Sequence, residues 1–131
     1  MSIDKYIGAL EARIASNSFV SSYTFTIDRK THDIAFLSGI IEFRNGTALD
    51  FKEFIESKGE AVEKYLYGYN HRRSGIVIFR YDNSPDPHAK KLKTFPHHKH
   101  LQTGELIESD SRIDLSAVLE EIEGSYTQKE E

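Results

Sequence analysis

The amino-acid sequence predicts an α+β domain in which an N-terminal and a C-terminal helix pack on an antiparallel sheet of about five strands. Near both ends of the chain, apolar residues recur every three or four positions, which is typical of a helix that buries one face. Between these segments, apolar residues alternate with polar ones or form short runs, which is typical of strands. Short polar turns join the runs and favour an antiparallel meander with helices on one face.

The first helix should begin after Ser2, whose hydroxyl can cap it, and continue for about three to four turns. From Phe19 to Ile27 the period changes to two, which predicts the first strand. The second strand, Ile34–Phe43, is apolar on both faces and is therefore expected near the centre of the sheet. The apolar face of the helix would consist of Ile3, Tyr6, Ile7, Leu10 and Ile14.

The next three strands follow at short intervals. Asn45-Gly46 is a strong hairpin signal and introduces the third strand, Ala48–Ile55. Ala61–His71 and Gly75–Tyr81 are the fourth and fifth strands. Alternation would place one row of the fourth strand on a single face, either open for stacking or packed against a helix. That row consists of Tyr65, Tyr67, Tyr69 and His71.

A loop and a closing helix complete the predicted domain. Asp82–Lys93 contains two prolines, an asparagine and a serine, so it is expected to be loop. Asp114 is a suitable N-cap for a helix that would end at Gly124. The predicted domain is therefore a single unit over residues 1–124, followed by a polar, disordered tail over 125–131. The inward side chains of the closing helix would be Leu115, Val118, Leu119 and Ile122.

Composition narrows the functional classes. The 131 residues contain no cysteine, which excludes disulfides and thiolate chemistry. We expect a cytoplasmic protein with no membrane association, because there is neither a signal-peptide pattern nor a stretch of about 20 apolar residues. The net charge is −4. However, residues 71–100 hold seven Lys and Arg against two Asp, together with five of the six histidines, whereas residues 105–131 hold nine acids against two basic residues. This asymmetry favours an anionic partner for the basic segment.

The chemistry is concentrated between Arg80 and Leu101. Three of the six histidines lie within four positions of the segment, with a lysine among them. If Pro96–His100 is extended, His98 and His100 point to one side of the chain and His97 and Lys99 to the other. Imidazole, ammonium and guanidinium groups can together supply the base, the acid and the cations that RNA cleavage by a ribose 2′-hydroxyl requires.

The candidate site residues follow from this chemistry. We expect a site without a cofactor and without a tightly held metal ion. The residues expected to gather in one shallow cleft are Arg80, Asp82, His97, His98, Lys99 and His100. The alternative is that His98, His100 and Asp82 bind a divalent metal, as in a metal-dependent phosphoesterase. Structural roles also remain open, since Asp82 and Asn83 are good turn formers and Arg80 could pair with Asp82. The candidate catalytic residues are His97, His98, His100, Lys99 and Asp82, and the candidate substrate-binding residues are Arg80, Tyr81, Asn83, Arg72 and Tyr69.

Arg80–Leu101 also resembles a known signature. Arg-Tyr-Asp-Asn-Ser-Pro, a variable spacer and Thr-Phe-Pro-His-His-Lys-His-Leu are similar to the motif of the TumE family, which are toxins of type II toxin–antitoxin pairs. The resemblance implies a ribonuclease-like inhibitor of translation that acts on RNA or ribosome-bound mRNA. It also implies a helix-turn-helix antitoxin as partner, and a homodimer is conceivable. The other interpretation is a non-catalytic module whose basic loop binds an antitoxin, a nucleotide or RNA.

Overall fold

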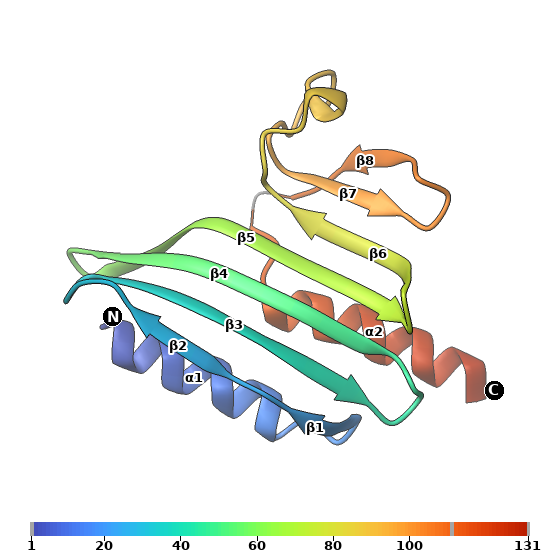
Figure 1. The fold of residues 1–131 in the computed structure, drawn as a ribbon, viewed down its shortest axis with the longest axis horizontal. Helices are drawn as coiled ribbons and strands as arrows, with labels where there is room; N and C mark the ends of the chain where they lie inside the picture. The colour runs from blue at the N-terminus through green and yellow to red at the C-terminus, as the bar shows by residue number, and fades with distance from the viewer. Residues whose placement is uncertain (1, 111, 131) are drawn as a thin grey trace.

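The computed structural model describes residues 2–110 and 112–130, and it contains one eight-stranded antiparallel sheet with a helix at each end of the chain (Figure 1). Both helices lie on the same face of the sheet, which confirms the α+β prediction. The elements in chain order are α1 Ile3–Ala15, β1 Val20–Tyr23, β2 Thr26–Arg29, β3 Ile34–Phe43, β4 Ala48–Lys58, β5 Ala61–Arg73, β6 Ile76–Asp82, the short 3-10 helix η1 Pro87–Ala89, β7 His98–Leu101, β8 Leu106–Glu108 and α2 Leu115–Glu130.

The predicted number of about five strands is wrong, because three further strands are present. The alternating segment Phe19–Ile27 forms two short strands, β1 and β2, which both pair with β3. The chain between them passes close over Gly39, where an added Cβ would lie 2.2 Å from the Thr24 carbonyl oxygen. At the other edge, β7 and β8 extend the sheet beyond β6, so the order is β1-β3-β4-β5-β6-β7-β8.

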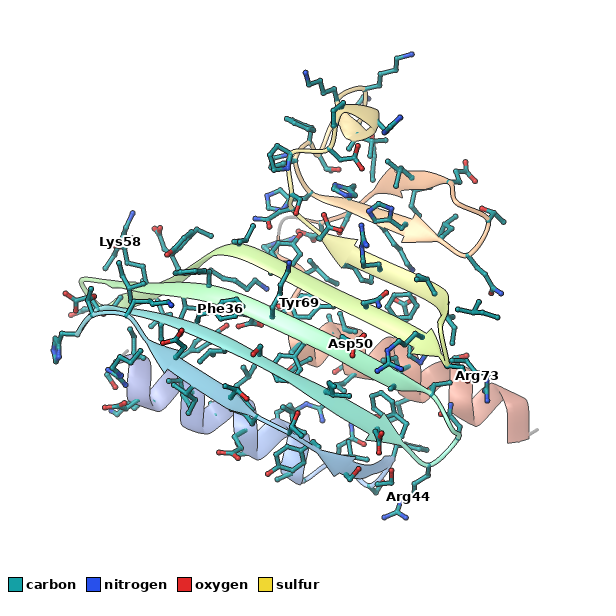
Figure 2. All side chains as sticks on the ribbon, in the orientation of Figure 1. Phe36, Arg44, Asp50, Lys58, Tyr69 and Arg73 are labelled. Atoms are coloured by element: carbon teal, nitrogen blue, oxygen red, sulfur yellow. The ribbon has the colours of Figure 1, made fainter. Side chains whose placement is uncertain are left out.

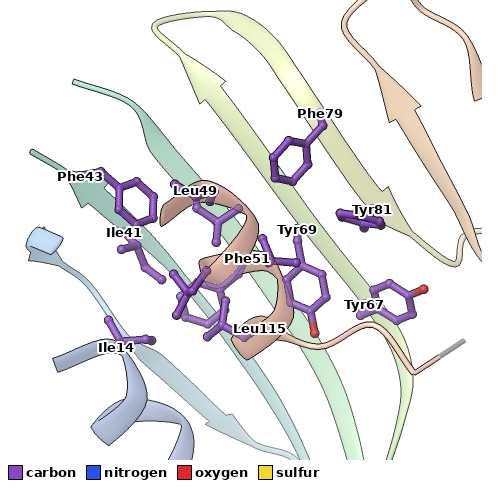
Figure 3. Close-up of a cluster of buried hydrophobic side chains, with 13 residues drawn as sticks. Ile14, Ile41, Phe43, Leu49, Phe51, Tyr67, Tyr69, Phe79, Tyr81 and Leu115 are labelled. Carbon is purple, nitrogen blue, oxygen red and sulfur yellow. The ribbon is translucent and has the colours of Figure 1, made fainter. Parts of the chain in front are cut away.

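The core lies between the sheet and the two helices (Figure 3). Alternate strand residues such as Leu49, Phe51 and Tyr69 face the helices and are almost completely buried. Leu115 of α2 and Ile14 of α1 pack against them, as their helical spacing predicts. Burying such side chains contributes roughly 1.5–3 kcal/mol each, so this face is committed to stability and the opposite face is left for function.

The helix starts agree with the sequence, but the end of α2 does not. The Ser2 hydroxyl accepts a hydrogen bond from the Lys5 backbone N–H, and the Asp114 carboxylate accepts one from the Ala117 N–H. Gly124 was expected to stop the last helix, yet α2 continues through it to Glu130. Residues 125–130, expected to be disordered tail, are therefore helical, and residue 131 lies outside the described residues. Neither helix, over the residues described, is long and apolar enough to cross a membrane.

Candidate active site on the open face

Pairing of β6 with β7 brings the two halves of the Arg80–Leu101 segment together. Arg80 is opposite His100 in this antiparallel ladder, and Asp82 is opposite His98. Residues that face each other across two strands, and residues two apart along one strand, project from the same face. The four side chains therefore form one cluster on the face that the helices leave uncovered, which we call the open-face cluster (Arg80, Asp82, His98 and His100).

Asp82 is the centre of the open-face cluster. Its Oδ1 lies 3.0 Å from His98 Nε2, and its Oδ2 lies 3.3 Å from His100 Nε2 and 3.0 Å from Arg80 Nε. The two imidazoles also meet, with their Nε2 atoms 3.0 Å apart. Only 6% of the Asp82 side chain is exposed, and the His98 side chain is fully buried. The carboxylate is further held by the Ser84 backbone N–H, which donates to Oδ1 over 3.1 Å.

The backbone fixes the tautomer of His98. Its Nδ1 lies 2.7 Å from the Pro96 carbonyl oxygen, which can only accept a hydrogen bond. Nδ1 must therefore carry a proton, and Nε2 of the neutral ring presents a lone pair to Asp82 and His100. An acceptor nitrogen that faces a carboxylate oxygen at 3.0 Å requires a positive charge between them, supplied by either a proton or a bound cation.

His100 and Arg80 form the solvent-accessible side of the cluster. The His100 side chain is 20% exposed, and its Nε2 lies 3.1 Å from an Arg80 guanidinium nitrogen. Burial lowers the pKa of His100, and the positive charge of Arg80 lowers it further against the opposing effect of Asp82. His100 is thus kept neutral near pH 7, which suits an imidazole that accepts a proton or binds a cation.

A shallow groove of about 460 Å³ leads across the open face to this cluster. Phe36 and Asp50, both labelled in Figure 2, belong to its lining together with Lys52, Arg80 and Asp82. A second depression borders His100 from the other side and is lined by Asp86 and His88, among others. The cluster therefore lies between two hollows, an arrangement that would let an extended ligand pass over it.

Comparison with known proteins identifies the family of the chain. The family model described as Toxin TumE matches residues 10–126, which is most of the chain. The chain belongs to the TumE toxin family. No significant match is found among curated proteins or among solved structures. In this TumE toxin the match includes all four residues of the open-face cluster.

The structure separates the histidine segment of the TumE toxin into two faces, so the predicted single cleft is wrong for His97 and Lys99. His97 stacks on Tyr67 with ring centroids 5.9 Å apart, and its Nδ1 lies 3.0 Å from the Tyr67 hydroxyl. Burial, followed by the charge of Lys64, lowers the pKa of His97. Lys99 lies under α2, where its ammonium donates to Glu121 over 2.8 Å. Neither side chain shares the face of Asp82, because strand alternation turns both away.

Replacing Lys99 by methionine is therefore expected to cost about 1 kcal/mol of stability and to leave any activity of the open-face cluster unchanged. The ammonium interacts with Glu121 and lies 4.9 Å from the ring centroids of Phe79 and Tyr81, and methionine preserves most of the aliphatic stem. Chemical denaturation and an initial-rate assay on the same preparation would check both parts. If Lys99→Met lost activity while its stability was unchanged, Lys99 would again be a candidate catalytic residue.

The tyrosines proposed for base stacking are unavailable in this fold. Tyr69 is fully buried beneath the sheet and its hydroxyl donates to Glu53 over 2.5 Å. Tyr81 is also buried, and its hydroxyl donates to Glu121 over 2.6 Å. Tyr65 leaves their row because β5 carries a bulge opposite Phe54 and Ile55, which shifts Tyr65 to the open face.

Asn83 and Arg72 have structural partners. The Asn83 side chain accepts from the Tyr67 backbone N–H and donates to the Tyr65 carbonyl, which fixes the chain leaving β6 to β5. Arg72 donates to both carboxylate oxygens of Asp50, over 2.7 and 3.1 Å. Asn83 is thus a poor candidate for ligand contact, whereas Arg72 lies next to a groove residue and orients it.

Proposed function

We propose that this TumE toxin is the growth-arresting partner of a toxin–antitoxin pair and that it cuts RNA engaged in translation at the open-face cluster. One observation supports this most strongly: a guanidinium, a carboxylate and two imidazoles converge within hydrogen-bond distance at the end of an open groove. Such a set matches the needs of phosphodiester cleavage better than those of simple packing.

Each member of the cluster has a role in this proposal. Arg80, whose side chain is 45% exposed, is placed to bind the scissile phosphate and offset its growing negative charge. His100 borders both solvent and Asp82, so it can take the proton of the attacking 2′-hydroxyl, either directly or through a bound cation. As the new P–O bond forms, the bond to the 5′-oxygen breaks, and this leaving oxygen receives a proton from the protonated imidazole or from solvent. His98 and Asp82 are buried and orient His100. All four roles depend on the same pairing of β6 with β7.

The groove supplies the binding surface for a single strand of RNA. Phe36 lines the groove and begins an aromatic row on the open face. The row continues beside the groove through Phe54 and Tyr65, with successive ring centroids 5.4 and 5.1 Å apart. Aromatic rings of this kind stack unpaired bases without strong sequence preference. In the proposed recognition of RNA, this row takes the place of the buried tyrosines. The row depends on the bulge in β5, which puts Tyr65 beside Phe54.

Growth of a bacterium after induced expression tests the proposed function. The wild type should arrest growth within one generation, and co-expression of the protein encoded next to it should relieve the arrest. A His100→Gln variant expressed to the same level should be harmless. Equal toxicity of the two proteins would remove the cluster from the mechanism, and the absence of any arrest by the wild type would contradict the toxin function itself.

Removing the positive charge of Lys52 from the groove should weaken RNA binding modestly. Lys52 lies on the groove wall, over Gly68 of the neighbouring strand. Lys52→Gln should lower affinity a few-fold and make the slope of log K against log salt shallower by roughly 0.7. Lys5→Gln removes the same charge from an exposed position on α1, across the sheet, and should change neither quantity. Equal effects of the two variants would indicate that overall charge, and not the groove, binds RNA.

A further inference from the structure

The two imidazoles and the carboxylate of the open-face cluster have the spacing of metal ligands. His98 Nε2 lies 3.0 Å from His100 Nε2 and 3.0 Å from Asp82 Oδ1, and His100 Nε2 lies 3.3 Å from the other carboxylate oxygen, Oδ2. One ligand atom from each of the three residues lies within 4.8 Å of the others. Atoms that occupy adjacent positions around an ion at about 2.1 Å lie roughly 3.0 Å apart in octahedral and 3.4 Å apart in tetrahedral geometry. We propose that Asp82, His98 and His100 bind one first-row divalent transition-metal ion, such as Zn²⁺.

The hydrogen bonds around the three residues support a cation at this point. His98 donates its Nδ1 proton to the Pro96 carbonyl, which aims the Nε2 lone pair at the other two ligands. A backbone carbonyl in that position is the usual orienting partner of a metal-bound imidazole. Asp82 likewise receives the Ser84 N–H on the oxygen nearest His98. A bound ion would lie between the Asp82 carboxylate and the two ring nitrogens that face it.

Two imidazoles and one carboxylate make an incomplete coordination shell. Such a set leaves positions for water or substrate, as catalytic sites do, whereas structural zinc sites have four protein ligands. Imidazole nitrogen also selects against Mg²⁺ and Ca²⁺, which prefer oxygen. The open positions would face the hollows on either side of His100 and Asp82. If the proposed function holds, the ion would polarise a phosphate oxygen of the RNA at this point.

Arg80 opposes the ion, and this gives a sharp test. Its guanidinium donates to Asp82 Oδ2 and lies 3.1 Å from His100 Nε2. It therefore competes with a metal ion for the lone pair of His100 Nε2. The side chain is 45% exposed and can turn toward solvent. Removing the charge of Arg80 should therefore favour metal binding, because a positive guanidinium repels a nearby divalent cation. A tightly held ion at this point would differ from what the sequence alone predicted, which was a site without one.

Calorimetric titration with Zn²⁺, after dialysis against a chelator, tests the inference without RNA. The wild type should bind one ion per chain. His100→Gln and Asp82→Asn should each weaken binding at least 10-fold, while Arg80→Gln should tighten it several-fold. His97→Gln, on the other face, should leave it unchanged. Mg²⁺ should not compete. Circular dichroism would verify that each variant is folded.

The possible outcomes separate the two proposals. Absence of stoichiometric binding, or binding that survives both ligand substitutions, would overturn the metal site. If either ligand variant fails to fold, Arg80→Gln decides, because it leaves all three ligands in place and an unchanged affinity would contradict the site. Zinc binding without RNA cleavage would keep the metal site and refute the ribonuclease. If metal-free protein still cleaves RNA and the cleavage depends on His100, the ribonuclease proposal stands and the metal site has no role in it.

Discussion

Replacing His100 by glutamine is expected to lower the rate of RNA cleavage by about 10²–10⁴. The imidazole is the solvent-accessible member of the open-face cluster, and its Nε2 contacts both Asp82 and Arg80. Glutamine has a similar length but can neither exchange a proton near neutral pH nor act as a good metal ligand. The loss should appear in kcat, because the phosphate contact proposed for Arg80 remains. Initial rates on a single-stranded RNA, with enzyme in defined excess metal, would measure it.

Folding should not account for that loss. His100 is a partly exposed residue near the sheet edge, and substitutions at such positions usually change stability by little. Lys99→Met is the matched control, since it alters the adjacent residue on the other face and perturbs stability slightly more. A His100→Gln variant that keeps wild-type activity, or a Lys99→Met variant that loses as much, would show that the reaction centre lies elsewhere.

Replacing Glu53 by alanine should destabilise the fold by about 3–5 kcal/mol. This carboxylate is fully buried under the sheet and accepts hydrogen bonds from the hydroxyls of Tyr6 and Tyr69. The ammonium of Lys64 donates to the same Tyr69 hydroxyl over 2.7 Å. Burial lowers the pKa of Lys64, while the charge of Glu53 raises it. Removing Glu53 would leave two phenols and a largely desolvated ammonium without their anionic partner.

The denaturation midpoint and the growth assay together would measure this effect. Glu53→Ala should lose toxicity through unfolding, and lower temperature should restore part of it. Glu56→Ala, three residues along the same strand, removes a carboxylate paired with the exposed Lys58 over 3.6 Å and should cost less than about 1 kcal/mol. Similar losses for both variants would mean that the buried network contributes little beyond surface charge.

Alternation of apolar and polar residues predicted much of the fold, and alternation along Pro96–His100 predicted which histidines share a face of the sheet. The period of two over Pro96–His100 predicted that His98 and His100 share a side opposite His97 and Lys99, and the strand β7 places them so. The hairpin at Asn45-Gly46 also forms, with Gly46 at φ 84°. These predictions succeeded because they depend on neighbouring residues and on local backbone geometry.

Features that depend on residues far apart in the chain could not be predicted. The strand β8 is only three residues long and is stabilised by pairing with β7, so local pattern gives little sign of it. The bulge in β5 moved Tyr65 to the open face, and tertiary packing, not periodicity, decides where a bulge lies. Lys52 and Phe36 line the groove because β3 and β4 are neighbours in the sheet, and the sequence pattern alone does not reveal this strand order. Gly124 failed as a helix stop because glycine is permissive, not obligatory, at a helix end.

The open-face cluster is proposed to cut RNA in translating cells. Mapping new RNA 5′ ends within minutes of induction tests this proposal, with wild type, His100→Gln and Lys99→Met expressed to equal levels of folded protein. We expect discrete new ends within coding regions for the wild type and Lys99→Met, and none above background for His100→Gln. Growth arrest by the wild type without new RNA ends, or the same ends with His100→Gln, would contradict the claim.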